Sequence, residues 1–278
     1  MVNRARNGIV LFVNARDEPA MEEWIIHHLC MGFSHIVVFD HKSIVPLSRL
    51  GTFRGRVTII PINLPDGSIK VPLMNRAIDM ARLLRAEWMM YLDADEFLYF
   101  KHMNSIGHLL RQFPFADAVT INWLMFGTSH HITQPDGLIM SNFTHCDSVL
   151  NPHVKSIVRP HRVTHSVNPH YFELINPARS YHVSKRRMPP SHPFFENNRL
   201  AVDAHAYIAH YMYQSEDVFH RRKGRPMDDG TTFAREAHSG GSDGIHTHAN
   251  KCVNTALSNK YAKRINEILK RRRNVGCV

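Results

Sequence analysis

Short apolar runs and amphipathic segments alternate along the first 125 residues of the chain. The apolar runs are bounded by polar residues and have the length of buried strands; they cover residues 8–13, 36–39, 57–60, 88–92 and 118–125. Apolar residues recur at helical spacing in further segments, which cover residues 21–31, 73–85 and 104–113. Strands that alternate with helices in this way predict an α/β fold with a mostly parallel central sheet covered by helices.

The second half of the chain has a less regular pattern. Residues 151–198 are rich in Pro, His and Asn without a clear period, and residues 228–250 are rich in Gly and Ser, so we expect the latter stretch to be flexible. The apolar segment 201–213 fits either a strand or a helix, and helical spacing returns in residues 215–223 and 254–273. No repeat or linker separates parts of the chain, so we predict a single domain.

Polar side chains follow three of the predicted strands at the point where each strand ends. They are Asn14, Arg16, Asp17 and Glu18 after the first strand, Asp40 after the second, and Asp93, Asp95 and Glu96 after the strand over residues 88–92. In sheets of this class, ligands bind beyond the carboxyl ends of the strands. We therefore expect these side chains to meet at one edge of the sheet, although they are far apart in the sequence.

The Asp93-x-Asp95 pair has the chemistry of a divalent-cation site. Alternate side chains of an extended chain point to the same side, so both carboxylates can reach one ion. Mg²⁺ and Mn²⁺ prefer carboxylate oxygens and share their ligand shell with substrate phosphates. An isolated Asp-x-Asp is also typical of a surface turn, so the shared location with the other strand ends is what supports the site. Asp95 is the better candidate for direct coordination, and Glu96, beside the apolar Phe97, is more typical of a structural acid.

Composition and charge narrow the class of protein. The chain has 278 residues with 44% hydrophobic and 21% charged residues, which is ordinary for a globular domain. Its net charge of +10 suits polyanions, nucleotide phosphates or acidic membrane surfaces. No apolar run reaches the roughly 20 residues of a membrane span. The four cysteines are scattered, without a Cys-x-x-Cys pair, so we expect a soluble protein of a reducing compartment.

Several ordered motifs resemble the GT-A glycosyltransferases of families 2 and 92. The opening motif is Asn14-x-x-x-Glu18-Pro19, followed by Glu23-Trp24-x-x-x-His28 and Phe39-Asp40. Asp93-Ala94-Asp95-Glu96-Phe97 is similar to the Asp-x-Asp-Glu-Phe signature of these families. Later blocks that resemble the families begin at Trp123, Lys155 and His210.

The resemblance implies a single GT-A domain that uses a nucleoside-diphosphate sugar, UDP-linked by default, and Mn²⁺ or Mg²⁺. Residues 1–125 would bind the nucleotide sugar, and residues 126–278 would bind the acceptor and supply the C-terminal helices. The sugar would pass with inversion to a hydroxyl of a glycan or glycoprotein. The residue roles carried over are Asp40 as the base-contacting acid, Asp93 and Asp95 with His210 at the metal, Asp93 also at the ribose, and Arg222 and Lys223 at the phosphates.

The sequence also departs from these families. Many members have Asn-x-Glu near the first strand, whereas the spacing here is Asn14-Ala-Arg-Asp-Glu18, so Asp17 can share the role of Glu18. His41-Lys42-Ser43 lacks the second acid that is common after Asp40. Many eukaryotic relatives carry a membrane anchor that we do not find here, so we expect a cytoplasmic enzyme of bacterial or large-virus origin.

The catalytic base is the least determined part of the predicted site. An inverting transfer needs a carboxylate that deprotonates the acceptor hydroxyl, and it should lie in the second half of the chain. The eligible acids are Asp136, Asp203, Glu216 and Asp217. We favour Asp136, because the turn Pro135-Asp136-Gly137 can project an acid into a cleft, although the same tripeptide is typical of a plain β-turn.

Other classes of function remain open on the sequence alone. A metal-dependent nucleotidyl or phosphoryl transferase would also use paired carboxylates, but the chain has no phosphate-binding Gly-x-x-x-x-Gly-Lys loop and no third acid block. A non-enzymatic nucleic-acid-binding module would explain the basic runs, but these lack interleaved aromatics, so we expect no nucleic-acid partner. His238, His246 and His248 could hold zinc, yet their Gly-rich surroundings are more typical of a mobile surface segment.

Overall fold

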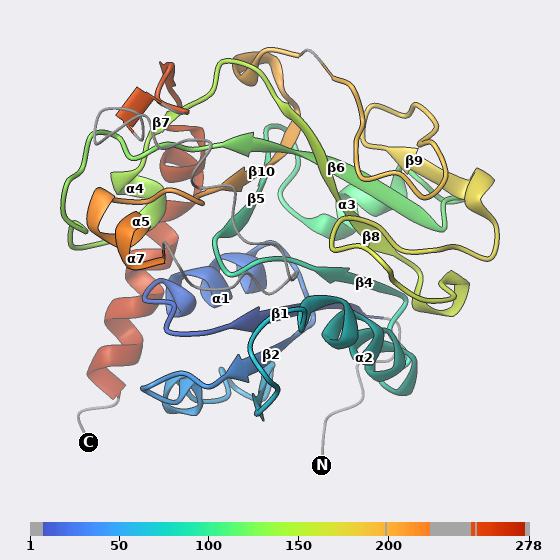
Figure 1. Cartoon of the computed structure of the whole chain (residues 1–278), viewed down its shortest axis with the longest axis horizontal. Coiled ribbons are helices and arrows are strands. Elements are labelled where there is room, and N and C mark those ends of the chain that lie inside the picture. The colour runs from blue at the N-terminus through green and yellow to red at the C-terminus, as the bar shows by residue number, and fades with distance from the viewer. Residues whose placement is uncertain (1–7, 198, 223–245, 248, 276–278) are drawn as a thin grey trace.

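A single mixed sheet forms the centre of the protein in the computed structural model, which describes residues 8–197, 199–222, 246–247 and 249–275 (Figure 1). The nine-stranded sheet has the order β3-β2-β1-β4-β8-β6-β10-β5, and β9 pairs with β6 outside this path. The strands are β1 (Ile9–Ala15), β2 (His35–His41), β3 (Val57–Ile62), β4 (Trp88–Tyr91), β5 (Glu96–Phe100), β6 (Ala118–Met125), β8 (Asn151–Val158), β9 (Ser180–His182) and β10 (Ala206–His210).

Most strand pairs in this sheet are parallel. Strands β3, β2, β1 and β4 are parallel to one another, and β6 is parallel to both β9 and β10. Strand β8 runs antiparallel to its neighbours β4 and β6, and β5 runs antiparallel to β10. The predicted α/β class with a mostly parallel sheet is thereby confirmed. A separate two-stranded sheet pairs β7 (His145–Cys146) with β11 (Cys252–Val253).

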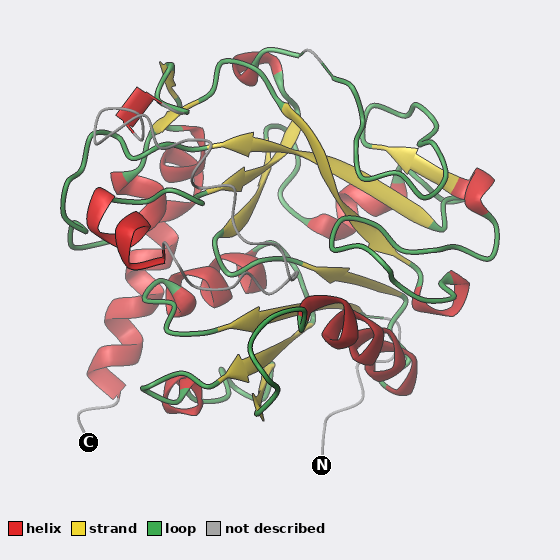
Figure 2. Cartoon of the chain, viewed as in Figure 1, coloured by secondary structure: helices red, strands yellow, loops and turns green. Residues whose placement is uncertain are grey.

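Helices cover both faces of the sheet (Figure 2). They are α1 (Met21–Cys30), α2 (Lys70–Leu83), α3 (Ile106–Arg111), α4 (Ile139–Asn142), α5 (Glu216–Arg222) and α7 (Ala256–Val275), with short 3₁₀ turns at Leu47–Leu50, Pro160–Arg162, Pro177–Arg179 and Ala201–Asp203. Helix α2 packs on one face, and α1, α3 and α7 pack on the other. No helix among the described residues combines the length and the apolar character needed to cross a bilayer.

Strand β1 shows why its apolar run is continuous. Val10 and Phe12 point to the face covered by α2, whereas Leu11 and Val13 point to the face covered by α1, and all four are fully buried. A parallel strand that is buried on both faces needs apolar residues at every position, so it reads as an unbroken run rather than an alternation.

The predicted elements of the first 125 residues match the observed ones closely, and α5 and α7 also form where helical spacing returns. Helix α1 ends just before Gly32, whose φ of +97° is the left-handed conformation that favours glycine. The segment 201–213 contains both a 3₁₀ turn, at Ala201–Asp203, and a strand, β10, at Ala206–His210. The stretch 228–250, which we expected to be flexible, lies largely outside the described residues.

Strands β5 and β8 were not predicted. Strand β8 contains Pro152, His153 and Lys155, so it has neither an apolar run nor a clean alternation. It is nevertheless central in the sheet, where the buried ammonium group of Lys155 meets the carboxylates of Asp93 and Glu96 from the β4–β5 connection. A contact of that kind has no local signature in the sequence.

Candidate active site

A cleft of about 750 Å³ opens at the carboxyl ends of β1, β4, β6 and β10. It is lined by most of the residues that the sequence marks as a site: Asn14, Arg16, Asp17, Glu18, Asp93, Asp95, His210 and Arg222. The two halves of the chain both contribute to this lining. The expected convergence at one edge of the sheet is therefore what the structure shows for these residues.

Asp93 is held between two lysines on the floor of the cleft. Its Oδ1 contacts Lys70 Nζ at the start of α2, and its Oδ2 lies 3.0 Å from Lys155 Nζ on β8. Burial by itself raises the pKa of the Asp93 carboxyl, but the two ammonium groups outweigh burial and lower that pKa well below its usual range. Asp93 is thus an ionised group whose two oxygens already have cationic partners.

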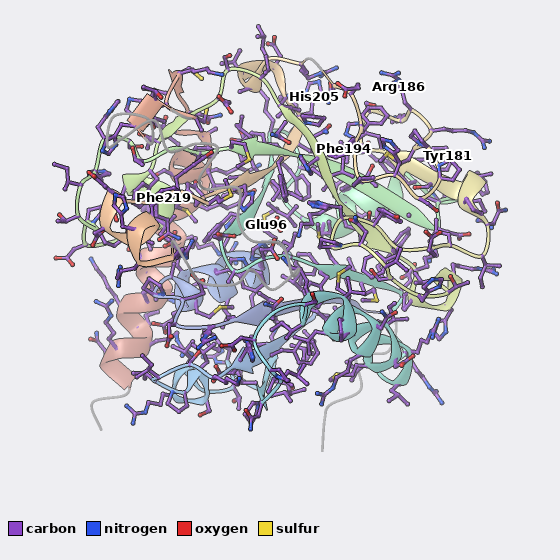
Figure 3. All side chains as sticks on the ribbon, in the orientation of Figure 1. Glu96, Tyr181, Arg186, Phe194, His205 and Phe219 are labelled. Carbon is purple, nitrogen blue, oxygen red and sulfur yellow. The ribbon has the colours of Figure 1, made fainter. Side chains whose placement is uncertain are left out.

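Glu96 lies behind Asp93 and is completely buried near the centre of the molecule (Figure 3). Its carboxylate accepts a hydrogen bond from the Asp93 backbone N–H at 2.9 Å and lies 3.4 Å from Lys155 Nζ. Burial, followed by the charge of Asp93, raises the pKa of Glu96. The buried Glu96 carboxylate thus stabilises the backbone of the Asp-x-Asp turn, which is the role of a structural acid.

Asp95, from the first half of the chain, contacts two residues from the second half. One carboxylate oxygen lies 3.4 Å from His210 Nε2, and the other lies 3.3 Å from Arg222 Nη1. Arg222 also reaches Glu18, at 2.7 Å, so it links the loop after β1 to the Asp-x-Asp turn. Although burial raises the pKa of Asp95, His210 and Arg222 lower it to about 2. Burial lowers the pKa of His210 in turn, but the neighbouring acids, Asp95 first, raise it above its ordinary value.

Asp95 and His210 fit part of a divalent-cation site. A carboxylate oxygen and an imidazole nitrogen 3.4 Å apart can both face one ion, and Mg²⁺ commonly takes only one or two protein ligands when substrate phosphates complete its shell. Among the residues that the structure describes, no three His, Cys, Asp or Glu side chains cluster as a self-contained metal site. Since lysines already hold Asp93, the protein ligands that fit are Asp95 and His210.

The loop after β1 is tied to the loops after β2 and β3 at the rim of the cleft. Asp17 accepts a hydrogen bond from the Ile44 backbone N–H at 2.7 Å, and Arg16 forms an ion pair with Asp66 at 3.0 Å. Asn14 accepts a hydrogen bond from the Tyr91 hydroxyl at 3.0 Å. These three predicted residues therefore shape the cleft as well as line it.

Asp40 does not line the cleft in this structure. Its carboxylate accepts hydrogen bonds from the backbone N–H groups of Ser43, at 3.3 Å, and Leu47, at 2.8 Å, and so holds the loop that follows β2. The side chain is buried. Its expected contact with a nucleotide base stays a prediction. Lys223, expected at the phosphates, lies outside the described residues.

The structure does not bring Asp136 to the cleft. Asp136 is exposed in a turn that is closed by Gly137, with a φ of +101°, and by the Asn142 side chain, which donates to the Asp136 carbonyl. Asp136 and Gly137 form a bend in the exposed segment before α4, away from the residues that line the cleft. Of the other eligible acids, Asp203, Glu216 and Asp217, none lines the cleft either.

Several cleft residues were not predicted as site residues. The sequence pattern indicated no role for Lys70 beyond its position just before a predicted helix. Trp123 and Lys155 appeared only as parts of family blocks. The ring centroid of Trp123 lies 5.0 Å from that of His153 and 4.4 Å from that of His210. Another unpredicted residue is Asp147, an acid from the second half of the chain that lines the cleft. Of the three histidines considered for zinc, only His246 is described, and it contacts Thr128 and Glu216.

An α/β fold with an acidic pair, basic side chains and a cleft at the strand ends is the arrangement expected of a nucleotide-sugar-dependent transferase. The family assignment agrees with this class. The sequence model of glycosyltransferase family 92 matches residues 14–239, and the chain belongs to that family. The resemblance noted in the sequence is thus confirmed, and the protein is a glycosyltransferase by family.

Comparisons with solved structures give remote similarities. One is to S. aureus TarS 1–349 in complex with UDP-GlcNAc, with 15% identity and a TM-score of 0.38 over 55% of this chain and 45% of that chain. Another is to UDP-glucose pyrophosphorylase complexed with UDP-glucose, with 10% identity and a TM-score of 0.31 over 93% of this chain and 99% of that chain. This chain thus spans less than half of the TarS chain. A search of the curated proteins finds no match.

Proposed function

We propose that the protein transfers a sugar from a UDP-sugar to a hydroxyl group of a glycan or glycoprotein, with inversion at the anomeric carbon and with Mn²⁺ or Mg²⁺ at the donor. The observation that carries the proposal is the pair formed by Asp95 and His210, 3.4 Å apart in a cleft that Lys70, Lys155 and Arg222 also line. UDP is the proposed nucleotide because of the sequence resemblance to GT-A enzymes.

The charges of the cleft suit a diphosphate. Asp95 and His210 would hold the cation, whose chemistry is to offset the negative charge that develops on the leaving diphosphate. Arg222 orients Asp95 through its contact with one carboxylate oxygen and leaves the other directed at His210. Lys70 and Lys155 neutralise Asp93, so the floor of the cleft does not repel an anionic donor.

Sugar transfer is favoured over the alternatives by the family assignment. A nucleotidyl transferase would release pyrophosphate, whereas a glycosyltransferase releases a nucleoside diphosphate. Identification of the product by anion-exchange chromatography separates the two reactions directly.

The test of the donor site is a thermal-shift panel of nucleoside diphosphates and nucleotide sugars, each with and without Mn²⁺. A ligand at 100 times its dissociation constant stabilises the folded state by about 2.7 kcal/mol, which is easily measured. We expect a UDP-sugar to raise the melting temperature, and Mn²⁺ to increase this shift. No shift with any nucleotide would refute the proposed donor site.

Variants locate the metal within the cleft. Asp95→Asn should keep the metal-free melting temperature shift and lose the part that depends on Mn²⁺. Asp79→Asn is the matched control, because Asp79 is an exposed residue of α2 whose charge partner is Arg82. An Mn²⁺-dependent shift that survives in Asp95→Asn would show that the cation is bound elsewhere.

A further inference from the structure

We propose that Asp147 is the catalytic base that takes the proton of the acceptor hydroxyl. The inference rests on the proposed function, because it assigns a residue to an inverting sugar transfer. Five acids line the cleft, and four of them, Asp17, Glu18, Asp93 and Asp95, come from the first half of the chain. Among the described residues, Asp147 is the one lining carboxylate from the second half.

The backbone places Asp147 two strands away from His210, across the end of β6. Asp147 directly follows β7, and its N–H donates to the Met125 carbonyl, at 2.9 Å, where β6 ends. Met125 is in turn the register partner of His210 on β10. Figure 1 shows the ends of β6 and β10 pointing together toward β7. Two strand spacings of about 5 Å each, with Met125 of β6 between them, therefore separate the backbones of Asp147 and His210.

The other lining acids are already held. Lys70 and Lys155 hold Asp93, Arg222 holds both Asp95 and Glu18, and a backbone N–H holds Asp17. Asp147 forms an ion pair with Lys251 Nζ at 3.0 Å, but the Lys251 side chain is 61% exposed. Ion pairs that are open to solvent are weak, so an acceptor hydroxyl can displace the Lys251 ammonium group from the carboxylate.

His153 is the rival proton acceptor in this wall of the cleft. Asn151 Oδ1 accepts the His153 backbone N–H at 3.0 Å, so the ring nitrogen Nδ1, 2.8 Å from the same oxygen, carries the imidazole proton. Nε2 therefore bears the lone pair. Burial, followed by the charges of His210 and Lys155, lowers the pKa of His153 to about 4.

Asp147 accepts one proton in the proposed sugar transfer. The acceptor O–H proton moves to a carboxylate oxygen of Asp147 while the acceptor oxygen forms a bond to the anomeric carbon. The bond from that carbon to the β-phosphate oxygen breaks, and its electron pair leaves with the nucleoside diphosphate. Attack and departure occur on opposite faces of the sugar, so the anomeric configuration inverts.

The test measures UDP release from a panel of UDP-hexoses with methyl glycosides as acceptor probes. Asp147→Asn should lower kcat by about 10²- to 10⁴-fold, the range lost with a general base, while the thermal shift by the UDP-hexose stays at its wild-type value. The acidic limb of the kcat–pH profile should also disappear. Asp147→Glu should recover part of kcat, and Asp79→Asn is the unchanged control.

The outcomes separate the two proposals. If the wild-type protein neither binds nor turns over any donor, the proposed function fails and the assignment of Asp147 fails with it. If the wild-type protein turns over and Asp147→Asn keeps its kcat, only the assignment is overturned. A large loss of kcat in His153→Gln or Asp136→Asn, with normal kcat in Asp147→Asn, would transfer the role to that residue.

Discussion

Lys155 and Lys251 form a natural comparison of a buried and an exposed ion pair in one protein. Lys155 Nζ lies 3.0 Å from an Asp93 oxygen, and Lys251 Nζ lies 3.0 Å from an Asp147 oxygen. The Lys155 side chain is 1% exposed, whereas that of Lys251 is 61% exposed. Because the two distances are equal, the pairs differ in their exposure to solvent and in the neighbouring charges of the buried pair, Lys70 and Glu96.

The structure sets the magnitude expected for Lys155→Met. Two unit charges 3.0 Å apart attract by roughly 5 kcal/mol at an effective dielectric constant of about 20. Removing the lysine also leaves Glu96, 3.4 Å away, without its cation. Breaking a buried pair of this kind costs about 3–5 kcal/mol, so we expect Lys155→Met to lose that much free energy of unfolding at pH 8. Lys251→Met should lose about 0–1 kcal/mol.

The loss in Lys155→Met should also depend on pH. Without the ammonium group, the folded-state pKa values of Asp93 and Glu96 rise, so the folded variant binds protons that the unfolded chain releases. Its stability therefore falls as the pH rises through these raised pKa values, and the difference from wild type is smaller at pH 5 than at pH 8.

Urea unfolding at pH 5 and pH 8, followed by circular dichroism, measures both effects. Lys251→Met is the matched control at each pH. Equal losses for the two variants would refute the argument that burial sets the strength of these pairs. A Lys155→Met loss that does not change with pH would show that Asp93 and Glu96 stay ionised without their lysine.

Two further predictions follow from groups outside the cleft floor. Burial raises the pKa of Glu23 to about 7, although it accepts backbone N–H bonds from Ile139, at 2.7 Å, and Met140. The native state thus keeps a proton on Glu23 that the unfolded chain loses above about pH 4.5. Between pH 4 and pH 8, the free energy of unfolding of the wild type should therefore fall by roughly 3 kcal/mol more than that of Glu23→Gln, as measured by urea titration. Parallel plots of unfolding free energy against pH for the two proteins would contradict this prediction. The Sγ atoms of Cys146 and Cys252 lie 3.5 Å apart on paired strands, so oxidised glutathione should convert the two thiols to a disulfide and release two reduced glutathiones. Peptide mass spectrometry under non-reducing conditions should find this link in wild type and not in Cys252→Ser.

The first half of the fold could be predicted because its signals are local. In β1 every residue from Val10 to Val13 is apolar, and in α1 the apolar residues recur at helical spacing, so each element is encoded by neighbours in the chain. The rule that ligands bind beyond the strand ends then placed Asp93 and Asp95 at the cleft without further information.

The second half could not be predicted in the same way. Strand β8 lacks a periodic pattern, because Lys155 is buried by contacts with acids rather than by apolar packing. Asp136 had the stronger turn signal, yet of these two acids only Asp147, in a segment with no motif, lines the cleft. A local pattern can mark a turn, but it does not say which way the turn faces.

The sequence alone determined the α/β class, the family and the acids at the strand ends, since these depend on short-range patterns and on ordered motifs. Only the tertiary structure decided which cation meets which carboxylate. Lys155 reaches Asp93 across 62 residues, and Arg222 reaches Glu18 across 204. Such contacts depend on strand order and register, which arise when the whole sheet assembles and which no single segment encodes.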